Sequence, residues 1–137
     1  YHHETDGTLC PKVTACHRHK MNAVVCIGEP EDIYEQERTQ LYLQTQIEEI
    51  GLSKMDHKNT IIAYEPLWAI GTGRTPSVEE VDNTIKFIKK LTPQHKVLYG
   101  GSVNSSNIMD FYKLKSVDGF LVGGASAKEE ELKKIFK

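Results

Sequence analysis

The sequence has few cysteines, no excess of positive charge and no long apolar run, and each absence excludes a class of protein. Three cysteines in 137 residues are too few, and odd in number, for a disulfide scaffold. Seventeen basic residues against nineteen acidic ones indicate neither a nucleic-acid-binding face nor an acidic tail. No apolar stretch could cross a bilayer, and the first residues do not resemble a secretory signal. We therefore expect a soluble intracellular, cytoplasmic protein without nucleic-acid or membrane partners.

Four short apolar runs divide the chain, and each is followed by glycine or glutamate. They cover residues 23–27, 60–64, 97–99 and 119–122. Runs this short and this uniformly apolar are typical of strands that are buried on both faces, as in a parallel sheet. On the same grounds we expect Cys26 to be a buried small hydrophobic residue.

Apolar residues at helical spacing lie before, between and after these runs. The stripes are Leu9, Val13 and Cys16; Leu43, Ile47 and Ile50; Val81, Ile85 and Ile88; Ile108, Phe111 and Tyr112; and Leu132, Ile135 and Phe136. Capping boxes at residues 77–80 and 126–129 predict two helix starts, and Gly51 predicts a helix end. Pro11 is tolerable only in the first turn of its helix.

One helix followed by four strand–helix units predicts an α/β fold with parallel strands, and no linker divides residues 1–137. Two architectures fit this order. The length favours an open doubly wound sheet, because a (β/α)8 barrel takes about 250 residues. The glycine-rich or acidic end of every strand favours the barrel, whose sites all lie at that face. The pattern leaves both open.

Glu65 ends the second apolar run and is followed by a stiff Pro66-Leu67-Trp68 segment and by a flexible Gly71-Thr72-Gly73 segment. This order is typical of a catalytic base on a rigid strand followed by a closing lid. Such a base works when desolvation raises its basicity, and Trp68, Leu67 and Ile70 could exclude water. The alternative is a solvated glutamate beside a glycine loop, with Trp68 in the core.

Gly100-Gly101-Ser102 and Gly123-Gly124 each follow an apolar run directly. Glycine lets the backbone approach a ligand and lets its N–H groups converge on an anion, so the pairs indicate a phosphate site. The alternative is two tight turns without a ligand. His2, His3 and residues 16–19 lack the spacing of a metal site and are expected at the surface. His95 is expected at the edge of the sheet away from catalysis.

Residues 63–73 (AYEPLWAIGTG) resemble the signature of the triosephosphate isomerase family. Residues 99–103 and 118–126 resemble its seventh and eighth strand ends, 25–29 its fifth, and 4–6 the segment after its fourth. The resemblance therefore covers essentially the whole chain. It implies that residues 1–137 are the carboxyl-terminal half of a single TIM-barrel domain. The chain starts at Tyr1 rather than Met, so we expect part of a longer protein.

The resemblance also implies a reaction and a role for each matching residue. It implies a cytoplasmic, homodimeric enzyme of glycolysis that interconverts D-glyceraldehyde 3-phosphate and dihydroxyacetone phosphate without metal or cofactor. Glu65 is the implied base. The implied phosphate-binding residues are Gly71, Ser102, Gly123 and Gly124, and the implied lid and latch residues are Pro66, Trp68, Ile70, Gly73, Tyr99 and Glu29, with Ser102 also helping to latch the lid. The segments that carry the family's catalytic lysine and histidine are not in this sequence. A second prediction is thus a non-catalytic half-barrel that at most binds phosphate or self-associates.

Overall fold

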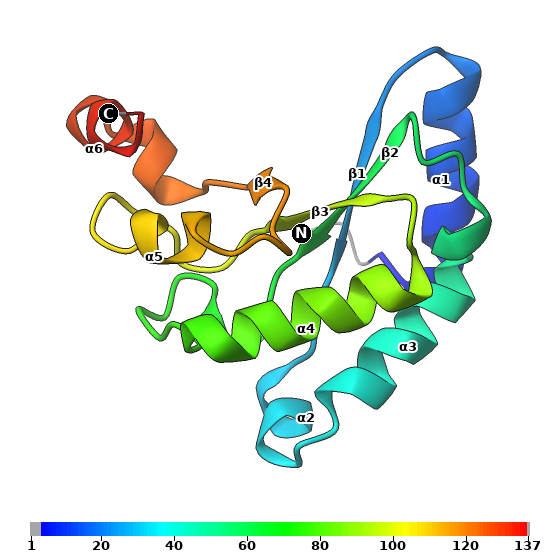
Figure 1. Ribbon diagram of the computed structural model, residues 1–137. Helices are drawn as coiled ribbons and strands as arrows, with labels where there is room; N and C mark the ends of the chain where they lie inside the picture. Colours follow the sequence, from blue (N-terminus) through cyan, green and yellow to red (C-terminus); the bar gives the residue numbers. More distant parts are fainter. Residues whose placement is uncertain (1–3, 137) are drawn as a thin grey trace.

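Four parallel strands form one sheet in the computed structural model, which describes residues 4–136 (Figure 1). The strands are β1 (Ala23–Ile27), β2 (Thr60–Tyr64), β3 (Lys96–Tyr99) and β4 (Gly119–Phe120), and they are neighbours in chain order. In the register, Val25 lies beside Ile62, and Ile62 beside Val97. Because all strands run in one direction, the loops after them meet at one edge of the sheet.

Helices connect the strands, as the alternating pattern predicts. They are α1 (Asp6–Arg18), α2 (Glu31–Glu35), α3 (Thr39–Ile50), α4 (Val78–Leu91), α5 (Ile108–Tyr112) and α6 (Glu129–Ile135). Three 3-10 turns, η1 (Leu52–Lys54), η2 (Leu67–Ala69) and η3 (Gly124–Ala127), complete the order. The parallel α/β fold is therefore confirmed. Helix α2 was not predicted, because none of its five residues is buried and it has no apolar stripe.

One predicted helix start is wrong, and Pro11 lies deeper in its helix than expected. Helix α1 begins at Asp6, so Pro11 lies in its interior rather than in its first turn. The predicted box at 126–129 does not cap α6, because η3 comes first and the Ser126 hydroxyl donates to the Gly123 carbonyl within that turn. Lys128 occupies the N-cap of α6 without a side-chain cap. The box at 77–80 is confirmed, since Ser77 and Glu80 exchange hydrogen bonds of 2.7 and 3.2 Å.

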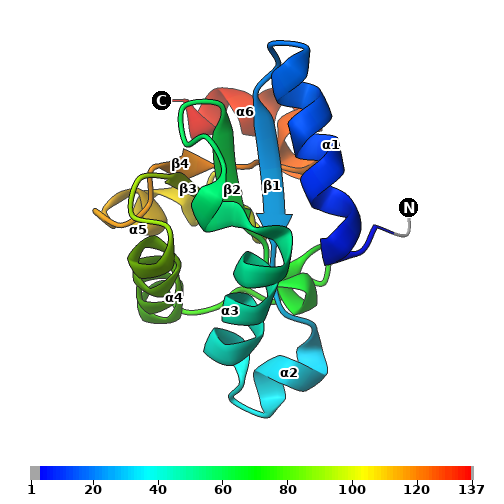
Figure 2. The same cartoon turned by 90° about the vertical axis from the view of Figure 1, so that its right-hand side faces the viewer.

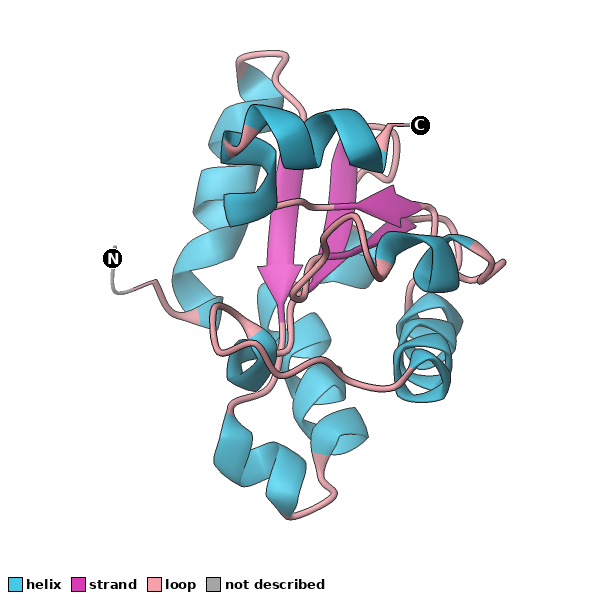
Figure 3. Cartoon of the chain, turned by 90° about the vertical axis from the view of Figure 1, so that its left-hand side faces the viewer, coloured by secondary structure: helices cyan, strands magenta, loops and turns pink. Residues whose placement is uncertain are grey.

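The core lies between the sheet and helices α1, α3 and α4, which pack side by side on one of its faces (Figures 1 and 2). Figure 3 views the strands from the side on which α5 and α6 lie. Strand β1 is buried on one face only, because Val25 is buried whereas Val24 is 47% exposed and Cys26 is also exposed. The prediction of burial on both faces is therefore wrong for β1. The described residues leave its second face uncovered.

Strand β4 is shorter than the predicted run of 119–122. Leu121 still donates its N–H to the Tyr99 carbonyl at 3.0 Å, but the chain then turns away from β3 into η3. Within residues 4–136, no helix combines the length and the apolarity that a bilayer span needs.

Candidate active site

The backbone of Glu65 is held rigidly at the end of β2. Its N–H donates to the Ile27 carbonyl at 2.8 Å, and on the other side the Gly100 N–H donates to the Tyr64 carbonyl at 2.9 Å. These bonds extend the sheet ladder past the end of the strand. The Glu65 carboxylate therefore leaves the sheet from a backbone that is fixed on both sides.

Two glycines make room for Glu65. A Cβ atom on Gly28 would overlap with the Glu65 carbonyl oxygen, and one on Gly100 would lie 2.7 Å from the Glu65 Cγ and 2.9 Å from its Oε1. Both distances are too short for any side chain, so the Glu65 side chain passes directly over Gly100. The sequence predicted that Gly100 approaches a ligand, whereas the structure shows that it approaches the carboxylate.

A cavity of about 780 Å³ opens where β2, β3 and β4 end. It is lined by segments far apart in the sequence, and Glu65 shares it with the glycines of three loops. The predicted residues in its wall are Glu65, Ile70, Gly71, Gly73, Ser102, Gly123 and Gly124. Within the described chain, no backbone hydrogen bond engages the N–H groups of Gly71, Gly123 or Gly124. The wall thus combines one carboxylate with main-chain donors, a combination suited to a ligand that carries both an acidic C–H and an anionic group.

Lys128 and Glu131 also line this cavity, and sequence reasoning missed both. Within residues 4–136, no ion pair engages Lys128, whereas Lys133 and Lys134 contact glutamates of their own helix. In the sequence, only their position shortly after the Gly123-Gly124 pair points to them. Which residues return to the cavity depends on the direction of the chain after η3, and no local pattern predicts that direction.

The lid segment, residues 66–73, is held in place at its centre by hydrogen bonds. Gly71 and Gly73 have φ angles of +69° and +78°, which favour glycine. The Thr72 hydroxyl donates to the Trp68 carbonyl at 2.9 Å, and the Ser102 hydroxyl donates to the Ala69 carbonyl. Ser102 therefore joins the lid segment to the loop after β3, and its role as a latch stays a prediction.

Trp68 does not line the cavity. Its ring stacks on Tyr34 at 4.0 Å, and its Nε1 donates to Glu29 Oε1 at 2.9 Å. The buried Glu29 carboxylate also accepts from the Tyr64 hydroxyl at 3.2 Å, and burial together with this carboxylate raises the Tyr64 pKa. The prediction that Trp68 covers the site is therefore corrected, because Trp68 anchors the start of the lid segment. Pro66 is buried beside it, and Ile70 reaches the cavity.

Tyr99 is the second predicted latch residue, and its side chain is fully buried. Its ring packs 4.7 Å from that of Phe111, and among the described residues its hydroxyl has no hydrogen-bond partner. Burial raises the pKa of this hydroxyl. Its latch role stays a prediction.

Cys26 lies beside Glu65 on the uncovered face of β1. The prediction of a buried cysteine is wrong, because this face has no covering helix within the described chain. Desolvation by neighbouring protein atoms, followed by a hydrogen bond and charge repulsion from Glu65, raises the Cys26 pKa to about 12. The thiol is therefore kept protonated next to the candidate base.

The histidines among residues 4–136 lie away from the cavity. His95 is buried at the start of β3, 6.3 Å from the His57 ring, and burial lowers its pKa. His17 contacts the Thr60 hydroxyl at 3.1 Å, and His2 and His3 lie outside the described residues. Across residues 4–136 no three His, Cys, Asp or Glu side chains gather as a metal site would require.

A sequence model of the triosephosphate isomerase family matches residues 1–137. The chain belongs to this family. The triosephosphate isomerase of Mycoplasmopsis agalactiae is 44% identical over 138 residues, which cover 98% of this chain and 53% of that protein. Those of Campylobacter concisus and Mycoplasma mobile are 43% and 37% identical, over 90% and 100% of this chain and 52% and 57% of their own lengths. The family predicted from residues 63–73 is confirmed, and the chain spans about half the length of these curated triosephosphate isomerases.

Proposed function

We propose that residues 1–137 supply the base, the lid and the phosphate site of a triosephosphate isomerase. The reaction would be the interconversion of D-glyceraldehyde 3-phosphate and dihydroxyacetone phosphate. The observation that supports it is the shared cavity, in which the Glu65 carboxylate faces the same space as the loop glycines. The intact protein would be a cytoplasmic, homodimeric enzyme of glycolysis.

In this proposal Glu65 removes a proton from the carbon next to the substrate carbonyl and returns it to the neighbouring carbon. The intermediate is an enediolate, and no atom is gained or lost. The N–H groups of Gly71, Ser102, Gly123 and Gly124, which we call the phosphate cradle, would bind the phosphate. Closure of the lid segment would exclude water and keep the phosphate in place. The family is itself the standard illustration of this acid–base tuning and loop closure.

The four strands would be half of an eight-stranded barrel that forms a single domain. Strands β1 and β4 each have only one neighbour, and the face of β1 that bears Val24 is uncovered within the described chain. Relatives of about twice this length support the same proposal. A closed barrel would pair both edges and bury that face.

A second function, phosphate binding without catalysis, is favoured by the composition of the cavity wall. An enediolate needs a donor or a cation at its oxygen. The described residues place no histidine on this cavity, and Lys128 is its one basic lining residue. For the 137-residue chain alone we therefore propose phosphate binding or self-association, with negligible isomerase activity.

The two functions are separated by measuring turnover and phosphate binding on the same purified chain. We expect inorganic phosphate to shift the backbone amide resonances of the phosphate cradle, and isomerase turnover to be absent. Turnover that disappears in Glu65→Gln would instead establish catalysis by this chain alone. Absence of any phosphate effect at the cradle would contradict both functions.

Gly124 offers a matched pair of variants. Gly124 is not among the glycines with positive φ and an added Cβ meets no atom within 4 Å, so alanine fits, and the first residue of a helical turn is the position at which proline is tolerated. Gly124→Pro removes the N–H donor, whereas Gly124→Ala keeps it. We expect phosphate affinity to fall about tenfold or more in the proline variant only, the equivalent of one hydrogen bond to a charged group.

A further inference from the structure

Two of the three loops that supply the proposed phosphate cradle, those after β3 and β4, are joined by only a short stretch of sheet. Ser102 lies in the loop after β3, and Gly123 and Gly124 lie in the loop after β4. The strands pair at two positions, Leu98 with Gly119 and Tyr99 with Phe120, and the last hydrogen bond between them runs from the Leu121 N–H to the Tyr99 carbonyl. Beyond that bond, the distance between the two loops depends on contacts outside the sheet.

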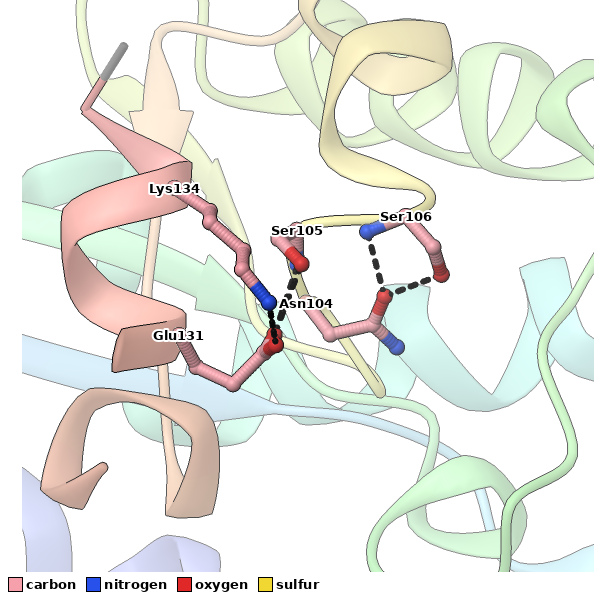
Figure 4. A network of polar contacts seen from close by, with 5 residues as sticks. All are labelled: Asn104, Ser105, Ser106, Glu131 and Lys134. Atoms are coloured by element: carbon pink, nitrogen blue, oxygen red, sulfur yellow. Dashed lines mark hydrogen bonds and ion pairs between the residues drawn. The ribbon is translucent and has the colours of Figure 1, made fainter. Parts of the chain in front are cut away.

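Glu131 makes such a contact. From α6, which follows the second loop, its Oε2 accepts from the Ser105 hydroxyl at 2.8 Å and from the Ser105 N–H at 3.3 Å (Figure 4). Lys134, on the same helix, approaches Glu131 Oε1 at 3.5 Å. The hydrogen bonds from Ser105, followed by Lys134, lower the Glu131 pKa, so the carboxylate is ionised over the neutral pH range.

Glu131 differs from the two glutamates before it in the residues that it contacts. Glu129 and Glu130 contact only Lys133 of their own helix in the described chain. Glu131 alone among the three reaches from α6 to the loop after β3.

The loop after β3 is rigid enough to carry this contact to Ser102. The Asn107 side chain donates to the Ser102 carbonyl at 2.7 Å and accepts from the Asn104 N–H at 2.9 Å. Asn104 in turn accepts from the Ser106 N–H at 2.9 Å (Figure 4). Ser105 therefore sits inside a hydrogen-bonded turn that includes the carbonyl of Ser102.

We propose that Glu131 is a positioning residue for phosphate binding: through Ser105 it holds the loop after β3 and the loop after β4, two of the three loops of the phosphate cradle, at the separation at which their N–H groups bind one phosphate. This inference rests on the proposed function. It assigns a task to a carboxylate that lines an anion site, where its charge alone would repel the ligand.

Because of that repulsion, the direction in which phosphate affinity changes in Glu131→Ala distinguishes a positioning role from a simple effect of charge. If the charge alone matters, Glu131→Ala strengthens phosphate binding. If Glu131 positions the loops, Glu131→Ala weakens binding even though a negative charge is lost. Glu131→Gln keeps an oxygen that accepts from Ser105. Ser105→Ala removes the shorter, hydroxyl hydrogen bond, keeps the backbone N–H donor and leaves the charge.

The experiment is a titration of the chain with inorganic phosphate, followed at the backbone amides of Ser102 and Gly123. We expect the dissociation constant to rise about fivefold in Glu131→Ala and in Ser105→Ala, the factor that corresponds to a lost hydrogen bond of this strength. Glu131→Gln should restore an affinity close to that of the unchanged chain. Glu130→Ala, the matched control, removes the same charge from the same helix and should not weaken binding.

The double variant tests whether the two residues act through one contact. Glu131→Ala with Ser105→Ala should lose no more affinity than Glu131→Ala alone. Tighter binding in Glu131→Ala, equal losses in Glu130→Ala, or additive losses in the double variant would each overturn the positioning role alone. Failure of the unchanged chain to bind phosphate would overturn the proposed function as well, so the two failures are distinguishable.

Discussion

At the scale of single residues, the geometry around Glu65 is decided by what its neighbours lack. Gly28 and Gly100 have no Cβ, and this lets the Glu65 backbone and side chain lie against them. Single residues also determine the charge around the site. Lys128 faces the cavity and has no ion-pair partner within the described chain, and Cys26 lies beside Glu65 as a protonated thiol. Each of these residues makes a separate prediction.

Lys128 should attract the phosphate. We expect Lys128→Ala to weaken inorganic phosphate binding about two- to fivefold, the effect of one charge about 10 Å from a dianion in water. The loss should shrink as salt rises, because salt screens an exposed charge. Lys133→Ala, in which the lost lysine contacts Glu129 and Glu130, is the charge-matched control, measured by the same titration. Equal effects of the two variants would show that only net charge matters.

Cys26 should react slowly with alkylating reagents. A pKa raised to about 12 leaves about one thiol in ten thousand ionised at pH 8, so alkylation should be about a thousandfold slower than for an ordinary cysteine. Since the pKa is raised, the rate should increase about tenfold per pH unit up to about pH 12. The measurement is mass spectrometry in a Cys10→Ser, Cys16→Ser background.

Glu65→Gln is the decisive variant for Cys26. It removes the carboxylate that contributes to the raised pKa and should speed alkylation about tenfold or more at pH 8. An unchanged rate would mean that burial alone protects the thiol.

At the scale of elements, α4 and α6 show how similar sequences start helices differently. Residues 77–80 and 126–129 both have serine followed three positions later by glutamate. Ser77 caps α4 through the Glu80 N–H, but Ser126 is used inside η3. The difference arises because the chain leaves β4 through a 3-10 turn before α6 begins.

This difference predicts unequal effects on stability. Ser77→Ala should lower the free energy of unfolding by about 1 kcal/mol, since it removes an N-cap. Ser126→Ala should change it by less than about 0.5 kcal/mol, because it removes only an exposed hydrogen bond. Urea denaturation measures both. A larger loss in Ser126→Ala would show that η3 contributes more to stability than the cap of α4.

At the scale of the whole molecule, strand β1 has one uncovered face and the described sheet has two edges without neighbours. Exposed apolar residues on an open sheet favour association, either with further strands of a longer chain or with a second copy. Val24 lies on that face, whereas the similarly exposed Met21 lies in the turn before β1.

The chain should self-associate through this face. We expect its sedimentation coefficient to rise with concentration, and Val24→Lys to weaken association at least tenfold, about 1.4 kcal/mol, because a charge would be buried in the contact. Met21→Lys, 53% exposed against 47% for Val24, adds the same charge away from the sheet and should leave association unchanged. A monomer at every concentration would contradict this prediction.

The sequence predicted most elements but not which residues share the cavity. Strands β1 to β3 and helices α3 and α4 were predicted from apolar runs, stripes and end signals that act over a few residues. Trp68 was expected over the site, but its indole N–H donates to Glu29 and so anchors the lid segment there. A buried indole N–H needs a hydrogen-bond acceptor, and the tertiary structure decides which acceptor is near. The exposure of Cys26 depends on what covers β1, which no local signal reports.

The sequence alone therefore determined the parallel α/β order, the family and the position of Glu65 at a strand end. Caps, apolar periodicity and strand runs are local interactions, and neighbouring residues suffice to predict them. Only the tertiary structure decided that Glu65 passes over Gly100, that Lys128 and Glu131 line the cavity, and that Ser105 bonds to α6. The contacts of Glu65 with Gly100 and of Ser105 with Glu131 join residues 35 and 26 positions apart. Their formation depends on how helices and loops pack once the sheet has brought the strand ends together.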